Sequence, residues 1–127
     1  MAQRKAADLS GLRILVVEDE FFVAMDIERM LKSLGCEVVG PVAKLRDAIR
    51  MAQQEMLDGA MLDVNLAGER VDPVADELAA RGIPFFFASG YGSKGLPARH
   101  AAAPALKKPF AEAAVAAMIA QALALSS

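Results

Sequence analysis

The feature that most constrains the fold is an alternation of short apolar runs with segments of helical periodicity. The first apolar run, residues 12–17, is rich in β-branched side chains and is followed at once by an acidic cluster. Its length and composition favour a strand buried on both faces of a sheet. After it, Val23, Ile27 and Met30 recur at the spacing of one helix face. Because the alternation continues along the chain, it predicts an α/β fold, a doubly wound parallel sheet with helices on both faces.

The pattern predicts five strands but only four full helices. The strands are expected at residues 12–17, 36–39, 60–63, 85–89 and 105–106, and the helices at 21–34, 44–56, 72–81 and 110–125. Gly40-Pro41 is predicted to end the second strand. Between the last two strands, residues 90–104 are rich in glycine and proline. We therefore expect a mobile segment there, with a short or irregular helix at most near residues 98–103.

Length and composition indicate one domain. We expect residues 1–11 to be a flexible leader and residues 12–125 to form the domain, with no output domain. The net charge of −2 gives no basic surface for nucleic acid or for an anionic membrane. No apolar run approaches the roughly 20 residues that span a bilayer, and the first residues lack the apolar core of a secretory signal. A cytoplasmic protein is therefore expected.

The chain has one cysteine and one histidine. An internal disulfide and a metal site built from several cysteines or histidines are therefore excluded. We interpret Cys36 as a small buried hydrophobic residue and His100 as a solvated loop residue.

Polar side chains follow four of the predicted strands. Glu18 and Asp19 follow the first, Asp63 ends the third, Ser89 ends the fourth and Lys108 follows the fifth. Parallel strands bring their carboxyl ends to one edge of the sheet, where ligands bind. Two carboxylates about 4 Å apart repel by about 1 kcal/mol even in water, and Mg²⁺, which prefers oxygen ligands, relieves this. A hydroxyl and an ammonium group beside such an ion could hold phosphoryl oxygens, and a carboxylate can accept the phosphoryl group covalently.

Four segments carry a resemblance to a known family. They are ILVVEDE (14–20), MLDVNL (61–66), FFFASGYG (85–92) and LKKPF (106–110). With these segments in order, residues 12–125 resemble the receiver domain of two-component response regulators. The resemblance implies the flavodoxin-like strand order 2-1-3-4-5.

The resemblance also implies roles for the acidic residues. Asp63 would accept a phosphoryl group from a histidine kinase or a phosphotransfer protein. Asp19 would bind Mg²⁺ directly, and Glu18 directly or through water. Asp63 and the backbone carbonyl of Asn65 would complete the protein ligands of the ion.

Further roles follow for residues after the fourth and fifth strands. Ser89 would donate a hydrogen bond to the phosphoryl oxygens, and Lys108 would pair with them. The Lys108–Pro109 peptide bond would be cis. The protein would then catalyse its own phosphorylation and the later loss of the phosphoryl group, and it would not be a metabolic enzyme.

Two departures from the family pattern resemble one subgroup. Ala105 stands where receivers usually carry a switch aromatic, and the helix expected within residues 90–104 is irregular. With PFFFASGYG (84–92), these features resemble the FATGUY receivers, which are often stand-alone partners of HWE or HisKA2 histidine kinases. We hypothesise that phosphorylation orders residues 90–104 through Ser89, with Tyr91 taking part of the aromatic's role.

Three aromatic residues are candidates for protein contacts. Phe21 and Phe22 begin the first helix beside the acidic cluster, and either they pack locally or they form a kinase-docking face. Phe110, at the start of the last helix, is the third candidate. The alanine-rich surface of that helix is either solvated or a contact for a homodimer or target.

Two other functions remain open. A phosphorylation-independent adaptor would keep the fold without the switch, in line with Ala105. A hydrolase with an aspartyl nucleophile, of the haloacid-dehalogenase type, would need an acid two residues after Asp63, where the chain has Asn65.

Overall fold

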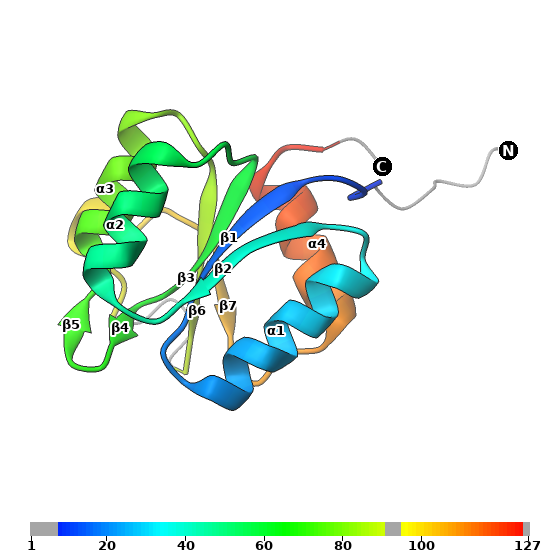
Figure 1. Ribbon diagram of the computed structural model, residues 1–127, viewed down its shortest axis with the longest axis horizontal. Helices are drawn as coiled ribbons and strands as arrows, with labels where there is room; N and C mark the ends of the chain where they lie inside the picture. Colours follow the sequence, from blue (N-terminus) through cyan, green and yellow to red (C-terminus); the bar gives the residue numbers. More distant parts are fainter. Residues whose placement is uncertain (1–7, 91–94, 126–127) are drawn as a thin grey trace, which may run out of the picture.

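The predicted parallel sheet is present, with helices on both of its faces (Figure 1). The computed structural model describes residues 8–90 and 95–125. The sheet has the order β2-β1-β3-β6-β7, which is the flavodoxin-like order expected from the sequence. Its strands are β1 (Arg13–Val17), β2 (Glu37–Val42), β3 (Gly59–Asp63), β6 (Phe85–Ser89) and β7 (Ala105–Lys107). The helices are α1 (Phe21–Ser33), α2 (Leu45–Gln54), α3 (Asp72–Ala80) and α4 (Glu112–Ala122).

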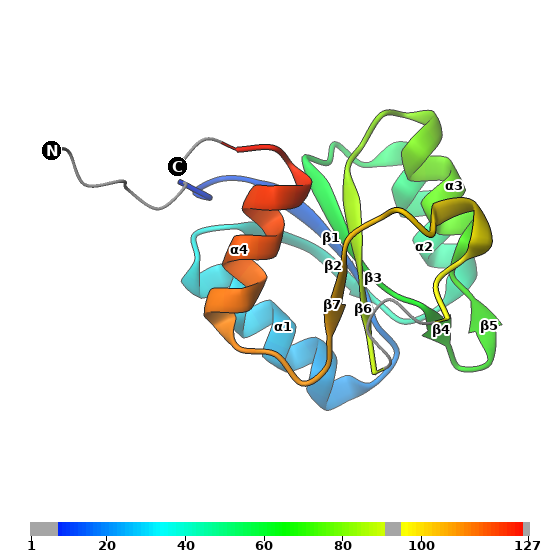
Figure 2. The same ribbon diagram turned by 180° about the vertical axis from the view of Figure 1, so that it is seen from behind.

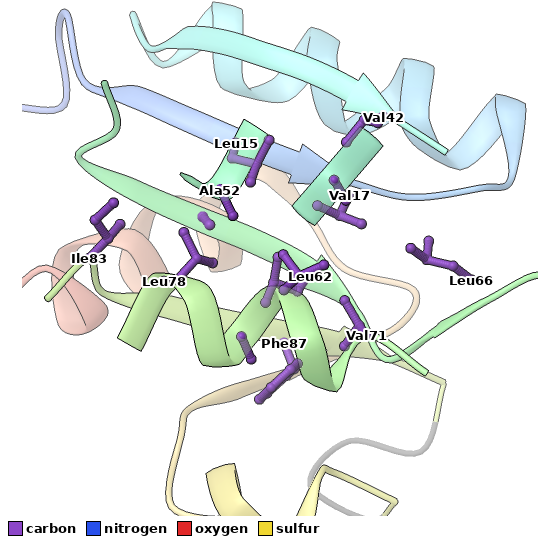
Figure 3. Close-up of a cluster of buried hydrophobic side chains, with 14 of the residues drawn as sticks. Leu15, Val17, Val42, Ala52, Leu62, Leu66, Val71, Leu78, Ile83 and Phe87 are labelled. Carbon is purple, nitrogen blue, oxygen red and sulfur yellow. The ribbon is translucent and has the colours of Figure 1, made fainter. Parts of the chain in front are cut away.

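One apolar layer lies between the sheet and helices α2 and α3 (Figure 3). Leu15, Leu62 and Phe87 project into it from three adjacent strands and are fully buried. Leu78 of α3 and Ala52 of α2 complete the layer from the helix side. This packing fixes the ends of β1, β3 and β6 relative to one another.

The second apolar layer lies on the opposite face, under α1 and α4 (Figure 2). Ile14, Met61 and Phe86 project into it from the same three strands, because successive strand residues point to opposite faces. Ile27 of α1 and Ile119 of α4 cover them. Among the described residues, no helix is long and apolar enough to cross a membrane.

The prediction that Gly40-Pro41 ends the second strand was wrong. Strand β2 continues through both residues to Val42. The register passes from Leu15 opposite Val39 to Val17 opposite Val42, so β2 carries a bulge. Because β2 is an edge strand, it can hold a proline without losing a central ladder hydrogen bond.

Two helices were predicted too long. Helix α2 ends at Gln54 because Glu55 adopts an extended conformation. The Nη1 atom of Arg81 donates to the carbonyls of Ala52 and Glu55 at 2.6 and 2.9 Å, which satisfies the helix end. Helix α4 spans 112–122 rather than 110–125, since Ala111 is extended and Ala124 has a φ of 54°.

Residues near the N-terminus bear on the predicted leader. Residues 1–7 lie outside the described residues. Leu9 is buried in the apolar layer under α1 and α4, and its carbonyl accepts a hydrogen bond from Cys36 Sγ at 3.6 Å. The Gly11 N–H donates to the Gly35 carbonyl at 2.8 Å. The packed domain therefore includes residues ahead of the boundary that we predicted at residue 12, and Cys36 is buried as predicted.

Two small elements complete the described chain. A hairpin of β4 (Asn65–Leu66) and β5 (Glu69–Arg70), which was not predicted, follows β3. Between β6 and β7, the 3₁₀ turn η1 (Ala98–His100) replaces a full helix, in agreement with the predicted short or irregular helix.

Gly40→Ala is expected to destabilise the fold more than Gly82→Ala. Both glycines have positive φ, 99° and 71°, so alanine at either position costs about 1–2 kcal/mol of strain. At Gly40 an added Cβ would lie 2.8 Å from the Val42 nitrogen and 3.0 Å from the Val16 carbonyl oxygen, whereas at Gly82 it would meet nothing within 4 Å. The clash adds about 1–3 kcal/mol, to be measured by urea unfolding. Equal losses would show that the bulge relaxes around the methyl group.

Candidate functional site

The polar residues that end or follow the parallel strands meet at the carboxyl end of the sheet. Glu18 and Asp19 come directly after β1, and Asp63 is the last residue of β3. Ser89 is the last residue of β6, and Lys108 follows β7. The last apolar residues of β1, β3 and β6 are buried, so the polar side chains that follow or end these strands lie where the chain leaves the sheet.

Three carboxylates form the centre of the site. Glu18, Asp19 and Asp63 each offer an oxygen, and these oxygens all lie within 4.8 Å of one another. Glu18 is almost fully buried, at 2% exposure, which is unusual for a carboxylate without a partner. Lys108 supplies the partner, with its Nζ 2.8 Å from Glu18 Oε1 and 3.6 Å from Asp63 Oδ1.

The surroundings of Asp63 make its carboxyl group a weaker acid than a free aspartate. Burial, reinforced by the charge of Glu18, raises the pKa of Asp63 to about 7, against the opposing pull of Lys108. Burial also disfavours the charge of Lys108. The hydrogen bond to Glu18 and the charge of Asp63 nevertheless raise the Lys108 pKa above its ordinary value.

The hairpin β4–β5 reaches the site through Asp19. The Ala67 N–H donates to Asp19 Oδ2 at 3.1 Å. Asn65, for which we predicted a role of the backbone carbonyl, uses its side chain inside the hairpin, where Oδ1 accepts the Gly68 N–H at 3.0 Å. Sequence reasoning missed this contact. Gly68 in a short polar segment was the available signal for a turn.

Ser89 ends β6, and Lys108 directly follows the neighbouring strand β7. Ser89 is buried at 4% exposure, and its carbonyl accepts the Lys108 N–H at 2.8 Å. The Lys108–Pro109 peptide bond is cis, which confirms that expectation. Ala105 is half-buried on β7 opposite Phe87. Tyr91, the other predicted switch residue, lies outside the described residues.

Of the three predicted contact aromatics, Phe22 and Phe110 line a pocket beside the site, and Phe21 does not. Phe21 and Phe22 are 69% and 80% exposed. A pocket of about 740 Å³ is lined by Phe22, Met25, Lys108 and Phe110 together with neighbouring α1 residues. Phe110 itself is half-buried and packs against the apolar layer under α1 and α4.

The interpretation of His100 as a solvated loop residue was wrong. Its side chain is 13% exposed, and its Nε2 lies 2.8 Å from Asp76 Oδ1 of α3. The ring packs edge-on against Phe85, with centroids 5.3 Å apart. Arg99 Nη2 pairs with the other oxygen of Asp76 at 2.7 Å. These contacts tie η1 to α3, and no local pattern in the sequence indicates them.

The donor set fits a hard divalent cation. Three carboxylates lie close enough to share one ion, and carboxylate oxygens are ligands that Mg²⁺ prefers. Lys108 already balances part of the negative charge on the side of Glu18 and Asp63.

Comparisons with known proteins identify the family. The solution structure of SdrG from Sphingomonas melonis Fr1 is 42% identical, with a TM-score of 0.79, over 90% of this chain and 97% of that one. The receiver domain of the sensor histidine kinase PA1611 from Pseudomonas aeruginosa PAO1 is 26% identical, with a TM-score of 0.75, over 91% and 99% of the two chains. The chain belongs to the receiver domains of response regulators. That PA1611 structure holds a magnesium ion in its active-site cleft.

A longer relative matches the same receiver domain. The phyllosphere-induced regulator PhyR of Methylorubrum extorquens is 35% identical over 122 residues, which cover 93% of this chain and 45% of PhyR. The receiver domain thus spans about half the length of the curated relatives it matches. No family model matches the chain.

The stability of the metal-free receiver domain is expected to fall with rising pH. The native Asp63 pKa of about 7 lies above the ordinary value of 3.8, so between these values the native state binds more protons than the unfolded state. The Asp63 contribution to stability is therefore lost progressively across this window and is absent above it. Urea unfolding in the presence of a metal chelator, at about pH 5 and pH 8, measures how the free energy of unfolding changes with pH.

The variant Asp63→Asn should lose this component of the slope. Asp47→Asn, on the solvent side of α2, is the control and should keep it. Identical slopes for Asp63→Asn and the unmodified chain would contradict the raised pKa.

Proposed function

We propose that this protein is a response regulator whose receiver domain accepts a phosphoryl group on Asp63. The observation that carries the proposal is the placement of Lys108 Nζ between Glu18 and Asp63, beside three carboxylates that can share a cation. This is an arrangement for charge neutralisation around one carboxylate at the open edge of the sheet.

Glu18, Asp19, Asp63 and the backbone carbonyl of Asn65 would hold Mg²⁺. When bound, the ion would neutralise charge on the carboxylates and on the phosphoryl oxygens. Its charge would also favour the ionised form of Asp63, which is the form needed for attack on phosphorus. The magnesium ion in the related PA1611 receiver domain supports this assignment.

The transfer step needs an incoming phosphohistidine. An ionised oxygen of Asp63 attacks the phosphorus, the new O–P bond forms as the N–P bond breaks, and the electron pair returns to the imidazole nitrogen. Lys108 would pair with the phosphoryl oxygens, and the Ser89 hydroxyl would donate to them. Hydrolysis by water would later restore the free carboxylate. A second SdrG structure, a BeF3-activated conformation, is 41% identical to this chain and supports regulation at such a site.

The kinase class and the output follow from the subgroup resemblance. We assign the protein to the FATGUY type of receiver. Its phosphoryl donor would be an HWE or HisKA2 histidine kinase or a phosphotransfer protein, and the transfer would take place in the cytoplasm. Ala105 and the short turn η1 in place of a full helix support this assignment. Output would pass through protein contacts, with the 90–104 segment responding through Ser89.

The donor would dock on the start of α1. Phe21 and Phe22 are exposed there, and the adjacent pocket brings Phe110 and Lys108 to the same surface. An exposed apolar patch beside a reactive group is suited to a partner that must reach that group.

A mass measurement tests the phosphoacceptor. Incubation with a small phosphodonor and Mg²⁺ should add one phosphoryl group to the unmodified chain and to the surface variant Asp47→Asn. Asp63→Asn should gain none, because it lacks the nucleophilic carboxylate. A gain that survives Asp63→Asn would place the modification elsewhere, and no gain in any chain would sink the proposal.

A substitution at the exposed aromatic pair tests the docking face. Phe22→Ala should slow phosphotransfer from a kinase that phosphorylates the unmodified chain by about 5- to 30-fold, as expected for a buried interface anchor. Its labelling by the small phosphodonor should be unchanged. Met56→Ala is the matched control, since Met56 is 79% exposed, nearly the same as Phe22, but does not line the pocket. Equal slowing of both variants would contradict the assignment.

A phosphorylation-independent adaptor is the second candidate, favoured by one observation. Ala105 leaves β7 without the switch aromatic of the family pattern, although it packs beside Phe87 in the core. An adaptor would bind its target equally well with and without phosphorylation. A homodimer formed through α4 is tested separately, by measuring the molecular mass of the protein in solution with and without phosphorylation.

A further inference from the structure

A continuous set of contacts joins the acidic site to the segment after β6. It begins at Asp19, where one carboxylate oxygen is held by the Ala67 N–H of the hairpin at 3.1 Å. Asp19 also offers an oxygen to the cluster that it forms with Glu18 and Asp63. An amide that holds one oxygen of a ligating carboxylate fixes the direction of the other, as outer-shell partners of metal ligands do.

The hairpin is anchored in the core behind this contact. Leu66 is buried at 1% exposure in the layer under α2 and α3. The Val71 N–H closes the base of the hairpin on the Val64 carbonyl at 3.0 Å. Ala67, at the tip, has a φ of 50°, which is unfavourable for a residue with a side chain. The conformation of the tip is therefore held by its contacts and not by the backbone preference of alanine.

Arg70 links the hairpin to the segment after β6. It stands opposite Asn65 in the hairpin. Its Nε donates to Asp72 Oδ1 at 3.1 Å, and its Nη2 donates to the Gly95 carbonyl at 3.2 Å. The planar guanidinium thus fixes two points at once, the start of α3 and the residue at position 95.

The segment that begins at Gly95 is itself fixed further along. Leu96 is half-buried against the α2 and α3 layer. Beyond it, Arg99 and His100 of η1 both contact Asp76 of α3. Figures 1 and 2 show the hairpin and the yellow segment around η1 on the same side of the molecule as α3.

We infer that Arg70 is a positioning residue that couples the Asp19 carboxylate to the segment from Gly95 to His100. A shift of the hairpin tip when Asp19 binds a cation would move Arg70 and, through its Nη2, the Gly95 carbonyl. The coupling is reciprocal. Because the hairpin amide orients the Asp19 carboxylate and Arg70 holds the hairpin, we expect loss of the Arg70 contacts to weaken cation binding at Asp19. The inference rests on the proposed Mg²⁺ site.

Magnesium titration of three variants tests the coupling. Arg70→Gln removes the charge and the two-point guanidinium contact, and Arg70→Lys keeps the charge without that contact. Arg50→Gln removes a surface arginine that pairs with Asp47 within α2. Affinity is read by calorimetry. Because an exposed ion pair contributes modestly, we expect Mg²⁺ to bind Arg70→Gln and Arg70→Lys about two- to fivefold more weakly than Arg50→Gln and the unmodified chain.

A second readout separates coupling from a merely structural role. The His100 N–H, which donates to the Pro97 carbonyl at 2.9 Å, is followed by NMR during the titration. Its resonance should shift with Mg²⁺ in the unmodified chain and in Arg50→Gln, and should shift less in both Arg70 variants.

Each outcome has one meaning. If the unmodified chain does not bind Mg²⁺, the proposed metal site fails and the coupling falls with it. If it binds Mg²⁺ but both Arg70 variants match it in affinity and in the His100 shift, the coupling alone is overturned. If Arg70→Lys matches the unmodified chain while Arg70→Gln does not, charge and not the two-point contact is responsible, and the inference is wrong.

Discussion

The structure depends on one electrostatic requirement, the neutralisation of three carboxylates at the end of a buried parallel sheet. Glu18 is almost fully buried, and such a carboxylate needs a charged partner that the local chain does not provide. Lys108 supplies this partner at 2.8 Å, and it follows β7, which is separated from β1 by two strands. That pair spans β1, β3, β6 and β7, so the strand order is what makes the site. The Asp63 carboxyl lies beside the pair, and burial raises its pKa to about 7.

Much of the site could be predicted from the sequence because its residues come at a recognisable place. A polar residue at the carboxyl end of a parallel strand has to lie where the strands of the sheet end. Asp63 and Ser89 end their strands, and Lys108 directly follows β7. The strand order and the short turn in place of a full helix were also predicted correctly. The chemical roles of these residues came from the family resemblance and stay proposals.

The missed features depend on contacts between distant residues. Strands β4 and β5 have two residues each, too short for any alternation of apolar and polar side chains. His100 reads as a loop residue until Asp76, 24 positions earlier, is placed beside it. The end of α2 is set by Arg81, and the length of β2 by its edge position, neither of which local propensity encodes.

The bulge in β2 has a consequence for the behaviour of the protein at high concentration. An exposed, regular edge strand is a template on which another chain can add a strand. Here one edge strand is interrupted by Gly40 and Pro41, and proline has no N–H to offer an incoming strand. The other edge, β7, is only three residues long. Both edges of the sheet are therefore poor templates, which protects an open parallel sheet of this size from edge-to-edge aggregation.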